Sequence, residues 1–347
     1  MGRRITKNDW GRRIKKNHHV YPSVDSINLP KKIKLIETHK NNAWEFHRSG
    51  WGHVLYGLNR LHSTTGVLFD DFFEQTHSVY YPENVRQETV PFKEEWVGFF
   101  HNPPNCPRWQ NYAHTPQMVF SRPEAQESMK MCRGIFVFTN YLKDWFDKNL
   151  DVPCEVLCHP TEMPEVTFDF DRFKSNPDKA VIQLGHHLRK LISIQKLKTD
   201  MLKIWFMSCD WAKQLRNIEL QTDDYPTIML NRGRYDEREW VDNDTYDILL
   251  SQNVVFMDLY DSSVNNAVIE CIVRDTPVLI NKIPPIVEYL GRDYPFYFED
   301  LDEASRKLHD MDLIKETYEY LNGMNKDKFC LNNFLTRLTE TEIYKGL

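Results

Sequence analysis

The residues best suited to chemistry in this chain lie in its second half, where a small polar loop leads from an apolar run into a helix. The apolar run covers residues 254–259, and the spacing predicts a helix over residues 264–274. The start of a helix offers free backbone N–H groups and the positive end of the helix dipole, which together can hold a phosphate. The residues expected to line this phosphate site are Ser263, Asn265 and Asn266.

One carboxylate, that of Glu270, falls within the first two turns of this expected helix. From there it can reach two hydroxyls of a ribose without lying against the phosphates. Spacing alone fits an ordinary helix with a solvated glutamate equally well. The nucleotide interpretation therefore needs a second group that complements a diphosphate.

A pair of cations supplies that second group. Arg189 and Lys190 follow Gly185, which ends the apolar run of residues 179–184. A departing nucleoside diphosphate accumulates negative charge, and fixed cations lower the barrier to its departure. An Arg-Lys pair after a strand is by itself more often a solvated surface. Together with Glu270, it favours a site for a nucleoside diphosphate.

Two features of the first half complete the set of candidates. Gly50, Trp51 and Gly52 stand immediately before apolar residues at helical spacing, and His101 follows the apolar run of residues 96–100. An isolated histidine is usually structural, but it is also the side chain most suited to proton transfer near neutral pH. His101 is therefore a candidate for a sugar contact or an acid/base role.

The elements that must position these residues alternate between strand and helix. This alternation predicts parallel βαβ units, an α/β fold and two Rossmann-like domains that face each other across a cleft. Ligands of open α/β sheets bind at the carboxyl ends of the strands. Strands are expected over residues 33–37, 66–69, 96–100, 134–138, 154–157, 179–184, 204–207, 254–259 and 277–280. Residues 159–164, together with the acidic and polar stretch to residue 178, predict a linker.

Composition bounds the class of protein. The 347 residues are 41% hydrophobic, which is enough for two folded domains and too much for a disordered chain. No apolar run approaches the roughly 18 residues that span a bilayer, so we expect a soluble, cytoplasmic protein. The seven cysteines are scattered and form no C-x-x-C pair, which fits a reducing compartment.

The charge is unevenly spread. The formal net charge is −6, yet the first 19 residues hold seven basic residues against Asp9 alone. An acidic body disfavours nucleic acid as a partner, because such binding needs basic charge along the contact face. The basic arm could make a weak contact with a membrane surface, and its first six residues fit the loose N-myristoylation pattern. The alternative is a flexible, solvated terminus.

The metal-binding patterns are weak. The Asp-x-Asp pairs at residues 169–171 and 242–244 follow no clear apolar strand, so solvated acidic loops are expected there. Cys154 and Cys158, beside His159, lack a second ligand pair and are expected to be core thiols. His186 and His187 are adjacent, so an extended backbone would point them to opposite faces. No metal site is predicted.

The segment of residues 258–281 resembles the C-terminal domain of nucleotide-sugar glycosyltransferases of GT-B fold, most nearly those like glycosyltransferase family 4. That family has a small-residue loop, a helix with a ribose-binding Glu, and a Gly-x-Pro turn into the next strand. Residues 262–266 look like the loop and Glu270 like the ribose carboxylate. Two positions depart from the pattern: Asp275 stands where Gly is usual, and Ser262 stands where many members have a second Glu.

The same resemblance extends over roughly residues 34–300. The segment from Gly185 to Lys190 resembles the loop whose Arg and Lys neutralise the donor diphosphate. Gly50, Trp51 and Gly52 resemble the glycine loop where donor and acceptor approach the backbone, and the strand before His101 resembles the one that ends in a cleft-facing His. The implied domains are a basic arm over residues 1–30, an acceptor domain over 31–165, a nucleotide-sugar domain over 175–325, and a helical tail over 326–347 that packs back on the N-terminal domain.

The resemblance implies a metal-independent glycosyltransferase that moves a sugar from a nucleotide-diphosphate donor to a glycan or another hydroxyl acceptor, without a cofactor. Glu270 would bind the ribose, and Arg189 and Lys190 the diphosphate. Two alternatives stay open. The basic arm would suit sugar transfer to modified DNA bases, and the serine at position 262 would suit a non-catalytic module that binds nucleotide sugars or glycans.

Overall fold

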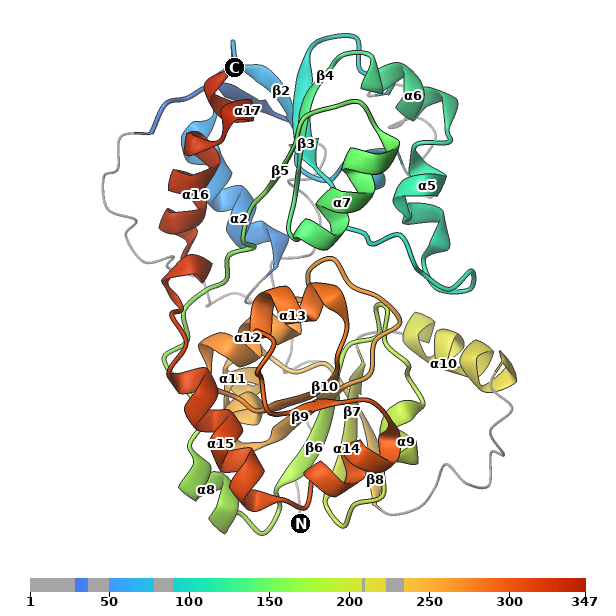
Figure 1. The fold of residues 1–347 in the computed structure, drawn as a ribbon, viewed down its shortest axis with the longest axis vertical. Helices are drawn as coiled ribbons and strands as arrows, with labels where there is room; N and C mark the ends of the chain where they lie inside the picture. The colour runs from blue at the N-terminus through green and yellow to red at the C-terminus, as the bar shows by residue number, and fades with distance from the viewer. Residues whose placement is uncertain (1–28, 37–49, 78–89, 208–209, 223–233) are drawn as a thin grey trace, which may run out of the picture.

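The computed structural model describes residues 29–36, 50–77, 90–207, 210–222 and 234–347, and it confirms the predicted pair of α/β domains (Figure 1). The N-terminal domain, at the top of the figure, holds a five-stranded parallel sheet in the order β1-β2-β3-β4-β5. Its strands are β1 Ile33–Leu35, β2 Val67–Asp70, β3 Trp96–Phe99, β4 Cys132–Val137 and β5 Cys154–Val156. Most of the basic arm, with its myristoylation pattern, lies outside the described residues.

Continuous apolar runs form the middle of this sheet, because helices cover both faces of a parallel sheet. All four residues of β3 are buried. The helices of the domain are α2 Trp51–Leu58, α3 Phe73–Thr76, α5 Pro116–Val119, α6 Pro123–Met129 and α7 Asn140–Asn149.

The C-terminal domain holds a six-stranded parallel sheet in the order β11-β10-β9-β6-β7-β8. The chain adds strands outward from β6 on one side and then returns to place β9 on the other side. The point between β6 and β9 is therefore the topological switch point, where ligands of such sheets bind. The strands are β6 Ala180–Leu184, β7 Leu202–Met207, β8 Tyr235–Glu239, β9 Val254–Met257, β10 Val278–Asn281 and β11 Tyr297–Phe298.

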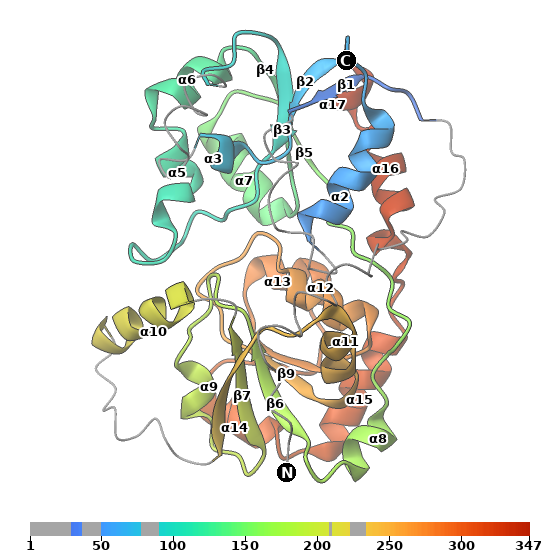
Figure 2. The same cartoon turned by 180° about the vertical axis from the view of Figure 1, so that it is seen from behind.

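Helices α12 and α13 lie at the end of this domain that is nearest the N-terminal domain in both views (Figures 1 and 2). The helices from α9 to α14 are α9 Ser193–Lys196, α10 Asp210–Thr222, α11 Asn243–Gln252, α12 Asn266–Val273, α13 Pro284–Leu290 and α14 Leu301–Lys307. Sequence reasoning identified α12 but missed β8, α10 and α11.

The chain crosses between the domains twice. After α15 Met311–Asn322, helices α16 Leu331–Glu340 and α17 Glu342–Lys345 return to the N-terminal domain, beside α2 (Figure 2). Leu331, Phe334, Leu335 and Leu338 join the core of that domain. At Gly57 of α2, an added Cβ would lie 2.6 Å from a methyl carbon of Leu331. A small residue at this position therefore lets α16 pack closely.

The predicted linker is wrong for its acidic part. Residues Phe170–Ser175 form helix α8, and Phe168, Phe170 and Phe173 are buried in the core of the C-terminal domain. Asp169 caps this helix, since its carboxylate accepts the N–H of Arg172 at 2.8 Å. Asp242 caps α11 in the same way. Both Asp-x-Asp pairs thus begin helices, where a side-chain oxygen satisfies a free N–H group.

Glycine at position 98 is required by the spacing of β2 and β3. An added Cβ there would lie 2.2 Å from the backbone oxygen of Asp70, and backbone atoms cannot move aside cheaply. We expect Gly98→Ala to lower the free energy of unfolding by about 1–3 kcal/mol, the usual cost of overpacking. Gly323→Ala, where the nearest atom is 3.5 Å away, is the control. Equal melting temperatures for the two variants would contradict this packing.

Candidate functional site

The two segments singled out in the second half lie side by side at the switch point. Arg189 and Leu259 form an isolated antiparallel bridge. The N–H of Lys190 donates to the carbonyl of Asp258 at 2.7 Å, and the N–H of Tyr260 donates to the carbonyl of Leu188 at 3.0 Å. The loop after β6 is thereby joined to the loop after β9, which leads into α12.

Arg189 is a buried cation in this arrangement, with 8% of its surface exposed. Its guanidinium donates to the carbonyl of His187 at 2.8 Å and reaches the side-chain oxygen of Asn265 at 3.5 Å. Its Nε is buried and has no hydrogen-bond partner within the described part of the chain. Burial lowers the pKa of Arg189 to about 10, and Glu270 is among the groups that oppose this shift. The side chain therefore stays positive near neutral pH.

Glu270 comes from the second turn of α12 and is fully buried. The hydroxyl of Tyr246, from α11, donates to its carboxylate. Burial and the neighbouring carboxylate raise the pKa of Tyr246 well above 10, so this hydroxyl remains a donor. Because Glu270 acts on the pKa of Arg189, the structure brings these two predicted residues into one electrostatic environment. Sequence reasoning missed Tyr246, since α11 itself was not recognised.

Lys190 turns away from this environment, although the sequence suggested that it would join Arg189 on one diphosphate. Its Nζ pairs with Asp258 at 2.8 Å and lies over the ring of Tyr260, and 38% of its side chain is exposed. Consecutive side chains of an extended segment point to opposite sides. Arg189 forms the bridge to Leu259, and the side chain of the next residue, Lys190, reaches Asp258. The two cations therefore have separate partners.

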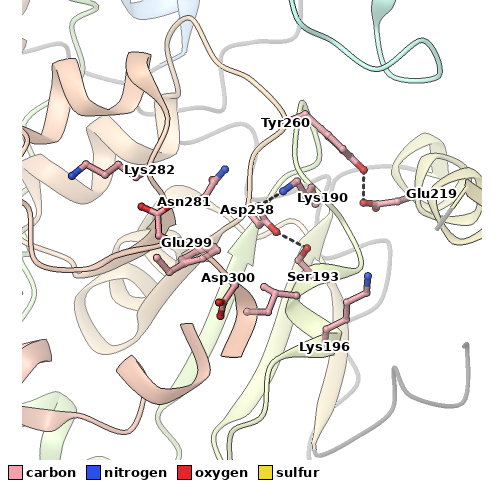
Figure 3. Close-up of a pocket in the computed structure, with 12 residues that line it drawn as sticks. Lys190, Ser193, Lys196, Glu219, Asp258, Tyr260, Asn281, Lys282, Glu299 and Asp300 are labelled. Carbon is pink, nitrogen blue, oxygen red and sulfur yellow. Dashed lines mark hydrogen bonds and ion pairs between the residues drawn. The ribbon is translucent and has the colours of Figure 1, made fainter. Parts of the chain in front are cut away.

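Lys190 lines a pocket of about 430 Å³, together with groups from the ends of β9, β10 and β11 (Figure 3). Asp258 accepts the hydroxyl of Ser193 at 2.8 Å, and Tyr260 donates to Glu219 at 2.8 Å. The pocket walls thus carry both signs of charge. Of the residues expected to bind a donor, Lys190 alone is among those that line it.

Most polar side chains of the predicted phosphate loop are buried. Asn265 is the N-cap of α12 and accepts the N–H of Val268 at 3.4 Å, and Asn266 is the first residue of that helix. The hydroxyl of Ser263 is buried and has no hydrogen-bond partner among the residues that the structure describes. This hydroxyl, the start of α12 and a desolvated guanidinium are therefore grouped around Asn265, an arrangement that suits a bound anion.

The two departures from the family pattern have structural counterparts. Asp275 adopts a left-handed backbone conformation with φ of 59°, which glycine, asparagine and aspartate tolerate best. Its carboxylate also pairs with Lys326. Ser262 is buried, while the carboxylate of the preceding Asp261 accepts the N–H of Asn105 and the hydroxyl of Tyr141, both at 2.9 Å. Asp261 thus joins the two domains.

The N-terminal candidates also come together. Trp51 and His101 are in edge-on contact, with ring centroids 4.4 Å apart. The indole N–H of Trp51 donates to Asp71 at 2.5 Å, and Nε2 of His101 lies 2.9 Å from the carbonyl of Asp71. A carbonyl can only accept, so Nε2 carries the proton. Gly50 is the N-cap of α2, and Gly52 lies in its first turn.

The described residues contain no group of three or more His, Cys, Asp or Glu side chains placed to hold a metal ion. Within the same part of the chain, no helix has the length and apolar character needed to cross a membrane.

Comparison with solved structures identifies the architecture. Sucrose-phosphate synthase from Thermosynechococcus elongatus is 11% identical, with a TM-score of 0.56 over 85% of this chain and 76% of that chain. Anabaena HepE, solved with UDP and glucose, is 11% identical, with a TM-score of 0.53 over 73% and 72%. A mutant of S. aureus TarM in complex with fondaparinux, alpha-GlcNAc-glycerol and UDP is 11% identical, with a TM-score of 0.52 over 84% and 59%.

These structures confirm the two-domain GT-B fold for this chain. No family model matches the sequence, and no curated protein matches it. The likeness to family 4 stays a prediction.

Glu219 holds the loop that carries the two cations, and this gives a pH dependence. Its carboxylate accepts the N–H groups of Leu191 and Ile192 at 2.6 and 3.2 Å. Burial raises its pKa from 4.5 to about 7. The folded state therefore keeps a proton that the unfolded state loses, and this stabilisation is full below pH 4.5 and disappears as the pH rises through 7.

We expect Glu219→Gln to remove this contribution, which changes by about 1.4 kcal/mol per pH unit between these pKa values. Urea unfolding from pH 5 to 8 would show a flatter profile for the variant than for wild type. Tyr260→Phe removes a hydrogen bond that lowers the pKa of Glu219, so its slope should extend to higher pH. Identical profiles for Glu219→Gln and wild type would contradict the assignment.

Proposed function

We propose that this protein is a glycosyltransferase that takes a sugar from a nucleotide-diphosphate donor and delivers it to a hydroxyl of a glycan or another acceptor. The GT-B fold supports this proposal, because two of the solved structures that share it contain UDP. The observation that carries it is the buried, charged Arg189 beside Glu270 and the start of α12.

The proposed donor lies at the switch point of the C-terminal sheet. Arg189 and the N–H groups at the start of α12 hold the diphosphate, with the hydroxyl of Ser263 as a further donor. Their charges are fixed before the sugar leaves, so they stabilise the leaving diphosphate without reorganisation. Glu270 accepts the ribose hydroxyls. Lys190 acts from the neighbouring pocket, where its ion pair with Asp258 leaves less charge for a ligand.

The acceptor lies on the N-terminal side, near Trp51 and His101. The carbonyl of Asp71 orients the imidazole of His101 through its Nε2–H. His101 is the proposed contact for a sugar hydroxyl. The reaction needs no cofactor.

Turnover of a nucleotide-sugar panel, measured as transfer and as hydrolysis, tests this proposal. We expect Arg189→Gln to lower kcat by roughly 10²–10³, the usual cost of losing one preorganised group at a developing charge. Glu270→Gln should weaken donor binding by about 10-fold or more, since hydrogen bonds to charged groups contribute about 1.5–3 kcal/mol. Arg133→Gln, an exposed cation paired with Glu95, is the control.

Turnover that is unchanged in both site variants would contradict the assignment. Tight binding of a nucleotide sugar with no turnover on any acceptor would favour the non-catalytic module instead.

A further inference from the structure

Two buried amide side chains of the N-terminal domain hold the loop that carries Arg189. Asn102 and Gln110 lie in the loop after β3, with 7% and 1% of their surfaces exposed. The amide N–H of Gln110 donates to the carbonyl of His186 at 2.8 Å. The imidazole Nε2 of His187 lies 3.2 Å from the side-chain oxygen of Asn102. Each amide thus reaches one of two consecutive residues across the domain boundary.

The buried carboxyl group of Glu74 holds Asn102 in place. One oxygen of Glu74, in α3, accepts the backbone N–H of Asn102 at 2.8 Å and its side-chain N–H at 3.1 Å. Because the NH₂ group of Asn102 faces Glu74, its carbonyl oxygen faces His187, and Nε2–H of His187 is the donor. Burial raises the pKa of Glu74 well above 4.5, and the N–H groups that it accepts oppose this shift.

The contacts end on the guanidinium of Arg189, which donates to the carbonyl of His187 at 2.8 Å. The loop does not hold this shape through its own backbone preference. Leu188 has φ of 57°, a left-handed conformation that is costly for a residue other than glycine. Such a conformation persists where surrounding contacts impose it, and here Asn102 and Gln110 contact the two residues before Leu188.

We propose that Asn102 and Gln110, with Glu74 behind Asn102, are positioning residues for Arg189. The N-terminal domain thereby completes the diphosphate site of the C-terminal domain when the two domains are together. This inference rests on the proposed function, in which Arg189 binds the donor diphosphate. None of the three residues needs to touch the donor.

Binding of UDP, GDP and ADP, measured by calorimetry on the full chain, tests the inference. We expect Asn102→Ala and Gln110→Ala each to weaken the affinity by about tenfold, equivalent to about 1.4 kcal/mol. Because both act through Arg189, Asn102→Ala should add nothing further in an Arg189→Gln background. A residue with a merely structural role would add its full effect there.

Two matched variants complete the design. Asn105→Ala lies in the same loop and at the same domain boundary. It removes a side-chain hydrogen bond to Tyr141 and keeps the backbone N–H that Asp261 accepts, so its affinity should equal that of wild type. Glu74→Gln keeps an oxygen that can accept from Asn102 and should retain binding, whereas Glu74→Leu should lose it about as much as Asn102→Ala.

The outcomes separate the two proposals. If Arg189→Gln weakens binding while Asn102→Ala and Gln110→Ala do not, the positioning role is wrong and the proposed donor site stands. Additive loss in the double variant, or equal loss in Asn105→Ala, would also overturn the positioning role. If Arg189→Gln binds the nucleotides as tightly as wild type does, or if wild type binds none of the three, both the proposed function and this inference are wrong.

Discussion

The candidate site depends on one buried cation, Arg189. A guanidinium withdrawn from water is costly unless charges and acceptors compensate it. At Arg189 this compensation comes from a backbone carbonyl, the side chain of Asn265 and the field of Glu270. Among the described residues, Nε of Arg189 has no hydrogen-bond partner. A desolvated cation at the switch point, beside the start of a helix, attracts an anion more strongly than a solvated cation would.

The domain boundary is built from a few carboxylates and amides that meet backbone groups. Asp261 accepts from Asn105 and Tyr141, and Glu288 of α13 accepts the N–H groups of Asn140 and Tyr141 at 2.7 Å each. Glu288 thus compensates the free N–H groups at the start of α7, where a negative charge is stabilising. Asp261 also opens the loop that leads to α12. The geometry of that loop and the approach of the N-terminal domain are therefore linked.

Strong local patterns allowed much of this structure to be predicted. Apolar runs such as residues 180–184 and 254–257 identified the central strands, and the polar loop before α12 pointed to Glu270, whose charge acts on the pKa of Arg189. Patterns failed at two polar segments. Charged residues surround the buried Phe170 and Phe173 of α8, and no residue of β8 is buried, so no apolar run marks that strand.

The parts of the site that sequence reasoning missed depend on long-range geometry. Arg189 and Lys190 look equivalent in sequence, but in the structure Arg189 reaches Asn265 and Lys190 pairs with Asp258. Glu74, Asn102 and Tyr246 lack any motif, because their partners lie 24 to 85 residues away along the chain.

A crystal structure with a bound nucleoside diphosphate would test the central claim most directly. The account predicts that the phosphate oxygens lie within hydrogen-bond distance of the Arg189 guanidinium and the N–H groups at the start of α12, with the ribose hydroxyls on Glu270. Phosphates bound instead by Lys190, Lys196 and Lys282 in the pocket of Figure 3, with Arg189 untouched, would contradict it.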